Sequence, residues 1–111
     1  AGLVLVTELR SVAADDLWLS PAHGRDSLGI HFTWRPEPGL VGEAVQAVEA
    51  ALAPFDARPH WAKVASVFAA DLRLRYPRLV DAAERRDAFD PAGVFRNDFL
   101  DRLLHRGQTP M

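Results

Sequence analysis

Three short, otherwise apolar stretches of this sequence carry closely spaced groups that could do acid–base and hydrogen-bonding chemistry. They are "TELR" at residues 7–10, "HFTW" at 31–34 and "HWAK" at 60–63, and they contain Glu8, Arg10, His31, Thr33, His60 and Lys63. An unpaired charge is expensive wherever such a stretch is buried or half-buried. Lys63 is also the only lysine of the chain. We therefore expect the three stretches to line one active site.

The first two stretches lie on predicted strands. Residues 2–12 and 27–35 are rich in β-branched, aliphatic or aromatic side chains, which favours extended structure. Side chains alternate between the two faces of a strand. One face is predicted to hold Val4, Val6, Glu8 and Arg10 in the first strand, and His31, Thr33 and Arg35 in the second. If these faces align in one sheet, they form a polar patch that an apolar sheet does not need for its stability.

Each stretch also has a simpler interpretation. Glu8 and Arg10 can be a solvated charge pair on a strand, which contributes little to stability. The imidazole of His31, beside Thr33, can be half-buried and bonded to a backbone carbonyl. The third stretch can be a surface loop whose Trp61 fills the core, with His60 and Lys63 incidental. Taken singly, none of the three signals decides between structure and chemistry.

Two other kinds of site are less well supported by the residue spacing. A metal site from Glu8, His31 and His60 uses suitable ligand types, but these lie far apart and show no His-x-x-x-His spacing. We therefore predict no metal. A hydrolytic triad is disfavoured because no serine lies in a nucleophile-elbow pattern, and Asp15 and Asp16 fall in a connection.

The remaining chain predicts several helices and their connections. Residues 13–26 read as a connection in which Trp18 is a candidate for a short extra strand. Apolar spacing predicts a helix over about 40–52, and a further helical region over 67–89 is interrupted at Pro77. Asn97 is a predicted N-cap of a last helix. We expect core positions, or contacts with another domain, at Trp34, Trp61, Phe95, Phe99 and Leu103; Phe95 is also expected to anchor the last helix.

Strands followed by helices predict an α+β fold, with an antiparallel sheet covered by several helices in one domain spanning residues 1–111. The net charge of -2 gives no basic footprint for nucleic acid. The chain has no cysteine and no uninterrupted apolar run of membrane-spanning length, so a cytoplasmic location is the default expectation. Composition thus indicates a globular domain without nucleic acid or membrane partners.

The order of the motifs resembles one enzyme family. "TELR", "DDLWLSP", "HFTW", "RPHWAK", "YPR" and "DPAGVFRNDFL" together are similar to the C-terminal part of the flavin-dependent alditol, xylitol and aldonolactone oxidases. The resemblance covers nearly the whole chain. It implies a two-domain flavoprotein of the vanillyl-alcohol oxidase type, in which FAD is bound mainly by an N-terminal domain absent from this chain. The chain alone is therefore not expected to catalyse.

The resemblance also implies roles for the polar residues. The parent protein would oxidise a sugar alcohol or aldonolactone by hydride transfer to flavin, with oxygen as the acceptor. Glu8 would accept hydrogen bonds from substrate hydroxyls, and Arg10 would stabilise developing negative charge. Thr33 and Lys63 would hold the polyol. His31 or His60 would accept the hydroxyl proton, with His31 favoured because it shares a face with Glu8 and Arg10.

A second reading from another functional class stays open at this point. The chain could be a non-catalytic binding module of the same ancestry, which associates with itself through the face that would otherwise meet the FAD-binding domain. Bound flavin in the native protein would distinguish the two readings. The expected partners are otherwise the FAD-binding domain of the same parent and a small polyol or sugar lactone.

Overall fold

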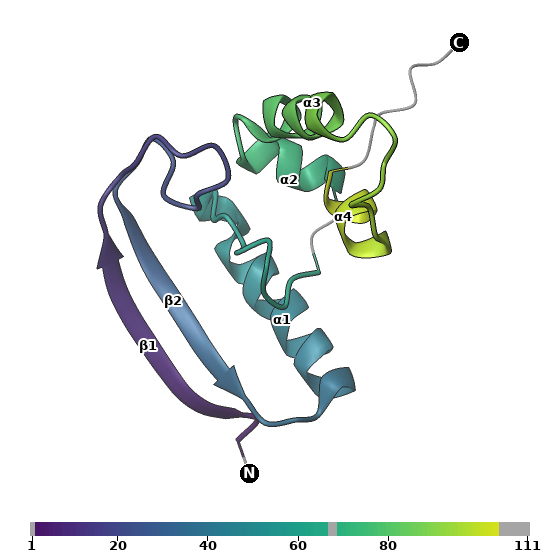
Figure 1. The fold of residues 1–111 in the computed structure, drawn as a ribbon. Helices are drawn as coiled ribbons and strands as arrows, with labels where there is room; N and C mark the ends of the chain where they lie inside the picture. Colours follow the sequence, from purple (N-terminus) through teal and green to yellow (C-terminus); the bar gives the residue numbers. More distant parts are fainter. Residues whose placement is uncertain (1, 67–68, 105–111) are drawn as a thin grey trace.

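The computed structural model describes residues 2–66 and 69–104 and has two structurally different parts (Figure 1). One part is an antiparallel pair of strands, β1 (Val4–Val12) and β2 (Ser27–Trp34). The other is helical, with the elements α1 (Pro38–Leu52), a 3₁₀ turn (Ala53–Phe55), α2 (Ala69–Arg75), α3 (Leu79–Phe89) and α4 (Asp98–Leu103). In Figure 1, α1 runs diagonally beside the strand pair, and α2, α3 and α4 gather at the upper right, away from the strands.

The two strands, here called the ribbon, pair with each other and with no further strand in the described part of the chain. Glu8 lies opposite His31, and Val6 lies opposite Thr33. A bulge between Val4 and Val6 shifts the register, so that Val4 lies opposite Trp34. An extra residue in one strand reverses which face of the sheet the following side chains occupy. The prediction that Val4 shares a face with Glu8 is therefore wrong, whereas the aligned polar face from Val6 onward is confirmed.

Local sequence signals explain the position of α1. Proline stands in the first turn at Pro38, where its missing N–H costs no helical hydrogen bond. Val41 and Val45, one helical turn apart, are its buried residues. Asp56 follows the 3₁₀ turn in the left-handed region with a φ of 53°, and its N–H bonds to the carbonyl of Ala53. This turn directs the chain away from the helix axis and into the loop that carries His60 and Lys63.

The best-packed core lies between α2, α3 and α4, away from the ribbon. It is built from Leu72, Tyr76, Leu79, Leu103 and Leu104, with Leu19, Trp61 and Ala83 packed against it. Pro77 separates α2 from α3, as expected for a residue that disfavours helix at the position before it. The Asn97 side chain accepts a hydrogen bond of 2.8 Å from the N–H of Leu100, which confirms the predicted cap of α4.

These observations confirm the α+β class, with helices beside an antiparallel sheet. Trp18 does not extend a strand; it lies in a turn, and the guanidinium of Arg78 lies 4.7 Å from the centre of its ring. Phe95 does not anchor α4, since 81% of it is exposed, whereas Leu103 is buried as expected. No helix within residues 2–66 and 69–104 has both the length and the apolar character needed to cross a bilayer.

Candidate active site

The predicted polar patch forms around the carboxylate of Glu8. Its Oε2 atom pairs with Nη2 of Arg10, two residues along the same strand, and lies 3.4 Å from Nδ1 of His31 on the neighbouring strand. Residues i and i+2 share a strand face, and directly opposed residues share it too. Strand pairing alone therefore brings these three side chains together. We call them the ribbon cluster.

The ribbon cluster is more exposed than the sequence suggested. The side chains of Arg10, Glu8 and His31 are 67%, 42% and 55% exposed, so the expectation of burial is wrong within this chain. Many apolar side chains of the two strands are exposed as well, whereas those of Phe32 and Trp34 are half-buried. Thr33 lies on the same face of β2, two residues from His31, and is exposed.

The second candidate group lies on the loop after α1. The N–H of Lys63 bonds to the carbonyl of His60 at 3.1 Å, which closes a tight turn. Nδ1 of His60 accepts a hydrogen bond of 3.1 Å from the N–H of Ala62, and its ring stacks beside Trp61. The ammonium of Lys63 is exposed and has no hydrogen-bond or ion-pair partner among the described residues. This cation is thus available to a ligand.

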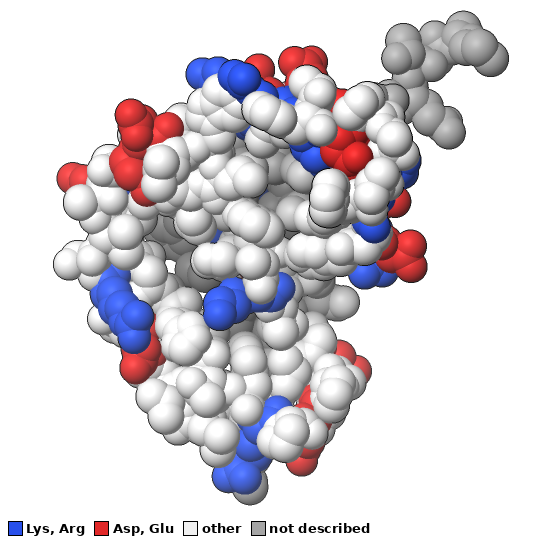
Figure 2. Space-filling model, viewed as in Figure 1, with Lys and Arg blue, Asp and Glu red and all other residues white. Residues whose placement is uncertain are grey.

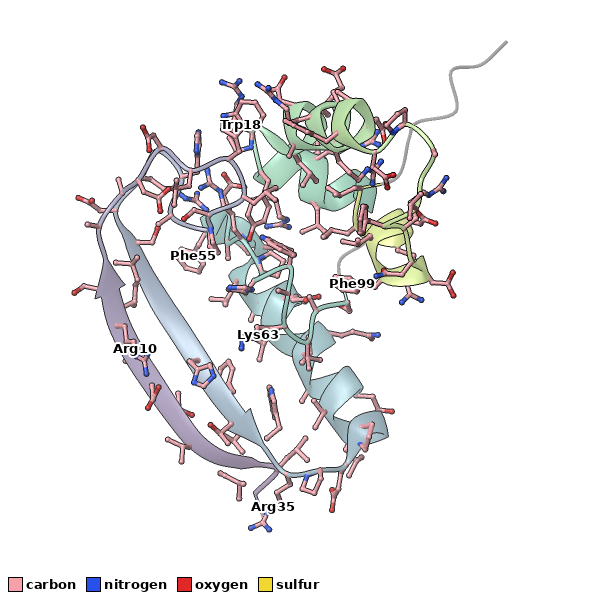
Figure 3. All side chains as sticks on the ribbon, viewed as in Figure 1. Arg10, Trp18, Arg35, Phe55, Lys63 and Phe99 are labelled. Atoms are coloured by element: carbon pink, nitrogen blue, oxygen red, sulfur yellow. The ribbon has the colours of Figure 1, made fainter. Side chains whose placement is uncertain are left out.

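The structure does not bring the two groups into contact. Figure 3 shows Lys63 near the middle of the molecule, between Arg10 on the ribbon and the group of α2, α3 and α4. Figure 2 shows the surface hollowed between the ribbon and the centre of the molecule, with basic side chains on both sides of the hollow. The candidate site therefore consists of two separate parts, which are the ribbon cluster and the loop of His60 and Lys63.

Comparison with known proteins identifies the family. The sequence profile described as D-arabinono-1,4-lactone oxidase matches residues 5–103. The chain belongs to the D-arabinono-1,4-lactone oxidase family. It is 47% identical to an alditol oxidase from a Streptomyces species over 104 residues, which cover 94% of this chain and 25% of that protein. It is 40% identical to an L-gulono-1,4-lactone dehydrogenase from Mycobacterium tuberculosis and 32% identical to the L-gulonolactone oxidase of Mus musculus, over 87% and 88% of this chain and 22% and 23% of those proteins.

The chain thus spans about a quarter of the length of these curated relatives. The family resemblance inferred from the motifs is confirmed. The names of the relatives include two oxidases and a dehydrogenase, acting on alditols or on lactones. By name, these three relatives are all oxidoreductases.

In this member of the lactone oxidase family, side chains that the sequence analysis missed hold the loop of Lys63. The guanidinium of Arg58 donates to three backbone carbonyls, and the hydroxyl of Tyr76 donates to the carbonyl of Pro59 at 2.6 Å. Nε1 of Trp61 donates to the carbonyl of Leu19 at 2.8 Å. In the sequence, Arg58 and Tyr76 are marked only by the proline that follows each of them. That pattern does not reveal partners 17 to 42 residues away.

Burial of these anchoring side chains changes their ionisation. Burial raises the pKa of Tyr76 to about 12, and the nearby Arg58 guanidinium opposes that rise. Burial also lowers the pKa of Arg58, and the charge of Arg25 lowers it further. Arginine nevertheless stays protonated at any physiological pH. The anchors of this lactone oxidase loop therefore keep one charge state under working conditions.

The candidate site residues do not form a metal-binding group. No group of three or more His, Asp or Glu side chains lies close enough to hold an ion, in the part of the chain that the structure describes. His60 is separated from the ribbon cluster, and its Nδ1 is used by the backbone of its own turn. The ribbon cluster and the ammonium of Lys63 offer hydrogen-bond donors and acceptors to a ligand.

Proposed function

We propose that this chain is the substrate-binding C-terminal part of an FAD-dependent oxidase that oxidises a sugar alcohol or an aldonolactone, with oxygen as the electron acceptor. The observation that carries the proposal is the ribbon cluster, in a chain that belongs to the D-arabinono-1,4-lactone oxidase family. A carboxylate shared between a guanidinium and an imidazole, on an exposed face, supplies an acceptor, a cation and a base within reach of one small polar ligand.

The overall reaction removes two electrons and two protons from an alcohol. The CH–OH group becomes C=O, and oxygen becomes hydrogen peroxide. FAD, when bound, would accept the hydride equivalent from the alcohol carbon. The residues of this chain then have two tasks, which are to hold the hydroxyl-rich substrate and to take the hydroxyl proton.

Geometry separates the two candidate proton acceptors. The carboxylate of Glu8 lies beside Nδ1 of His31, which favours a proton on that nitrogen and leaves Nε2 as a free acceptor. Nδ1 of His60 instead accepts the backbone N–H of Ala62, so that the neutral ring carries its proton on Nε2. His31 is therefore the better general base.

The other roles follow from charge and position. Arg10 neutralises Glu8 and can stabilise negative charge that develops on the substrate oxygen. Thr33 extends the same face with a hydroxyl that can donate or accept, and Lys63, from the opposite part, holds a distal hydroxyl. His60 contributes a donor from the same loop. The catalytic set is Arg10, His31 and Lys63, and the substrate-binding set is Glu8, Arg10, Thr33, His60 and Lys63.

The start of the longest helix does not fit the diphosphate of FAD. A helix N-terminus that binds a diphosphate offers free N–H groups, usually after glycines. The longest helix, α1, has Glu37 at its N-cap and Pro38 at its first position. The carboxylate of Glu37 would repel a phosphate, and Pro38 has no N–H group to donate to one. We propose that FAD is bound mainly by another domain of a two-domain flavoprotein.

An experiment on the full-length protein tests the proposal. Replacing His31→Asn should slow flavin reduction by an alditol or aldonolactone about 100-fold or more, the usual contribution of a general base. The matched control His60→Asn, also an exposed histidine, should change the rate less than about threefold, as expected for an ancillary contact. Bound flavin is read from the visible spectrum, and equal melting temperatures of the variants would exclude a folding effect.

Two results would contradict the proposal. An unchanged reduction rate in His31→Asn would remove its role as base. A native protein that carries no flavin would instead support the alternative of a non-catalytic binding or dimerisation module, which the exposed apolar residues of the ribbon favour.

A further inference from the structure

The guanidinium of Arg58 joins three segments that are far apart in the sequence. Its Nη1 donates to the carbonyls of Pro21 at 3.1 Å and His23 at 2.6 Å, in the connection between the two strands. Its Nε donates to the carbonyl of Arg75 at the end of α2, at 2.7 Å. A guanidinium presents its donors in a fixed planar fork, so these bonds set the orientation of the segments as well as their separation. We call this arrangement the Arg58 clamp.

Neighbouring contacts hold the same loop from the other side. Nη1 of Arg75 donates to the carbonyl of Ala57 at 2.6 Å, so Arg58 and Arg75 bond each other's segments reciprocally. Arg25 of the strand connection donates to the carbonyl of Asp56 at 2.7 Å. Tyr76 donates a further hydrogen bond to the carbonyl of Pro59, three residues after Asp56. Residues 56–59 therefore have little freedom, although they form no regular secondary structure.

The clamp lies shortly before Lys63, the residue proposed to contact substrate. Lys63 lies five residues after Arg58, and the intervening Trp61 is fixed to Leu19. Beyond Lys63, both the N–H and the hydroxyl of Ser66 bond to the carboxylate of Glu49 on α1. The side chain of Lys63 itself makes no hydrogen bond or ion pair with the described residues. The anchors on either side of Lys63 therefore set the position of its backbone.

We infer that Arg58 is a positioning residue that acts through Lys63: the clamp fixes where the ammonium of Lys63 stands relative to a substrate bound at the ribbon. The part of the inference that concerns substrate rests on the proposed function. The part that concerns the position of the loop rests on the observed contacts alone. If Arg58 only stabilised the fold, replacing it would have the same effect with or without the side chain of Lys63. A positioning role instead predicts effects that depend on whether Lys63 is present.

The first test is independent of activity. Lys63 is the only lysine in this chain, so within this segment a lysine-specific endoproteinase cuts at the Lys63–Val64 bond. In the full-length protein, the products of cleavage at this bond are identified by their masses. Arg58→Gln, which adds no lysine, should raise the rate of this cleavage about tenfold, since local opening governs native-state proteolysis. The matched control Arg102→Gln, at an exposed arginine in α4, should leave the rate unchanged. Equal cleavage rates for Arg58→Gln and the native protein would overturn the inference.

The second test is a double-mutant cycle on the full-length enzyme with a polyol substrate. Arg58→Lys should raise KM about tenfold and change kcat less than about threefold, because a displaced Lys63 weakens binding more than chemistry. In a Lys63→Met background, Arg58→Lys should add less than about twofold. A full tenfold effect in both backgrounds would show that Arg58 acts on its own and would overturn the inference.

The two tests also separate the inference from the proposed function. If Arg58→Gln accelerates cleavage at Lys63 while Lys63→Met leaves KM unchanged, the clamp orders the loop but Lys63 does not bind substrate. That result would overturn the proposed substrate contact and, with it, the catalytic purpose of the clamp. Faster cleavage together with the non-additive KM effect supports both.

Discussion

The helical end of the molecule and the ribbon differ in what holds them together. The packed cluster of Leu72, Tyr76, Leu79, Leu103 and Leu104 belongs to the region of α2, α3 and α4. The ribbon is held by backbone pairing, while seven of its apolar side chains remain exposed, namely Val4, Leu5, Val6, Leu9, Val12, Leu28 and Ile30. A pair of strands without a covering layer is marginally stable in water.

This difference shows that the candidate chemistry lies mostly on the part that contributes least to the core. The ribbon cluster occupies an open sheet face, whereas Lys63 is positioned by the clamp, which is attached to the helical end. Exposed apolar surface of this kind normally meets another surface. Under the proposed function, we expect the FAD-binding domain to cover the ribbon and complete the site; the curated relatives are about four times as long as this chain.

The largest expected effect tests the core against the ribbon directly. Leu79→Ala should lower the free energy of unfolding of this chain by about 3 kcal/mol, since Leu79 is 2% exposed. Leu28→Ala should cost less than about 0.5 kcal/mol, since Leu28 is 65% exposed. Urea unfolding measures both. Equal costs would mean that the ribbon is packed in solution, and a larger Leu28→Ala cost in the full-length protein would show that the ribbon is covered there.

A smaller effect tests the hydroxyl that joins the core to the Lys63 loop. The pKa of Tyr76 is raised by burial to about 12, against an ordinary value of 10.0. Below pH 10 both states keep the proton. Between pH 10 and 12 the unfolded state loses it first, so the free energy of unfolding should fall by about 2 kcal/mol.

Tyr76 is the only tyrosine of the chain, so tyrosinate absorbance follows its ionisation without interference. Urea unfolding at several alkaline pH values measures the loss of stability. The variant Tyr76→Phe should lack this component and lose about 1 kcal/mol at neutral pH, because the carbonyl of Pro59 loses its partner. Ionisation near pH 10 in the folded protein would contradict the burial argument.

The smallest effect concerns the ribbon cluster itself. Glu8→Gln should change the free energy of unfolding by no more than about 0.5 kcal/mol, because exposed ion pairs contribute little. The same substitution in the full-length enzyme should impair turnover if the cluster contacts substrate. A stability loss above about 1 kcal/mol would instead indicate that the carboxylate is there for the fold.

Several elements were predictable because their signals are local. Alternation and β-branched content predicted both strands, and apolar spacing predicted α1. Pro77 marked the break between α2 and α3, and Asn97 marked the start of α4. The pairing of Glu8 with His31 was also predictable, since it requires only that two neighbouring strands align.

Other features depended on contacts that no local pattern contains. The bulge that moves Val4 to the other face results from a register choice between strands. The exposure of Phe95 depends on which side of its turn faces the core, and the spacing of apolar residues does not specify that. Thr33 and the cluster beside it were expected to be half-buried, but burial requires a second layer, which the described residues do not supply.

The sequence by itself thus determined the elements of this protein, its family and the residue types at the candidate site, because these depend on composition, spacing and motif order along the chain. Only the tertiary structure decided that His31 and His60 have different hydrogen-bond partners, and that Arg58 ties Lys63's loop to two distant segments. The physical reason is that a hydrogen bond depends on the separation and direction of atoms in space. For residues 17 to 37 positions apart, the fold sets that geometry.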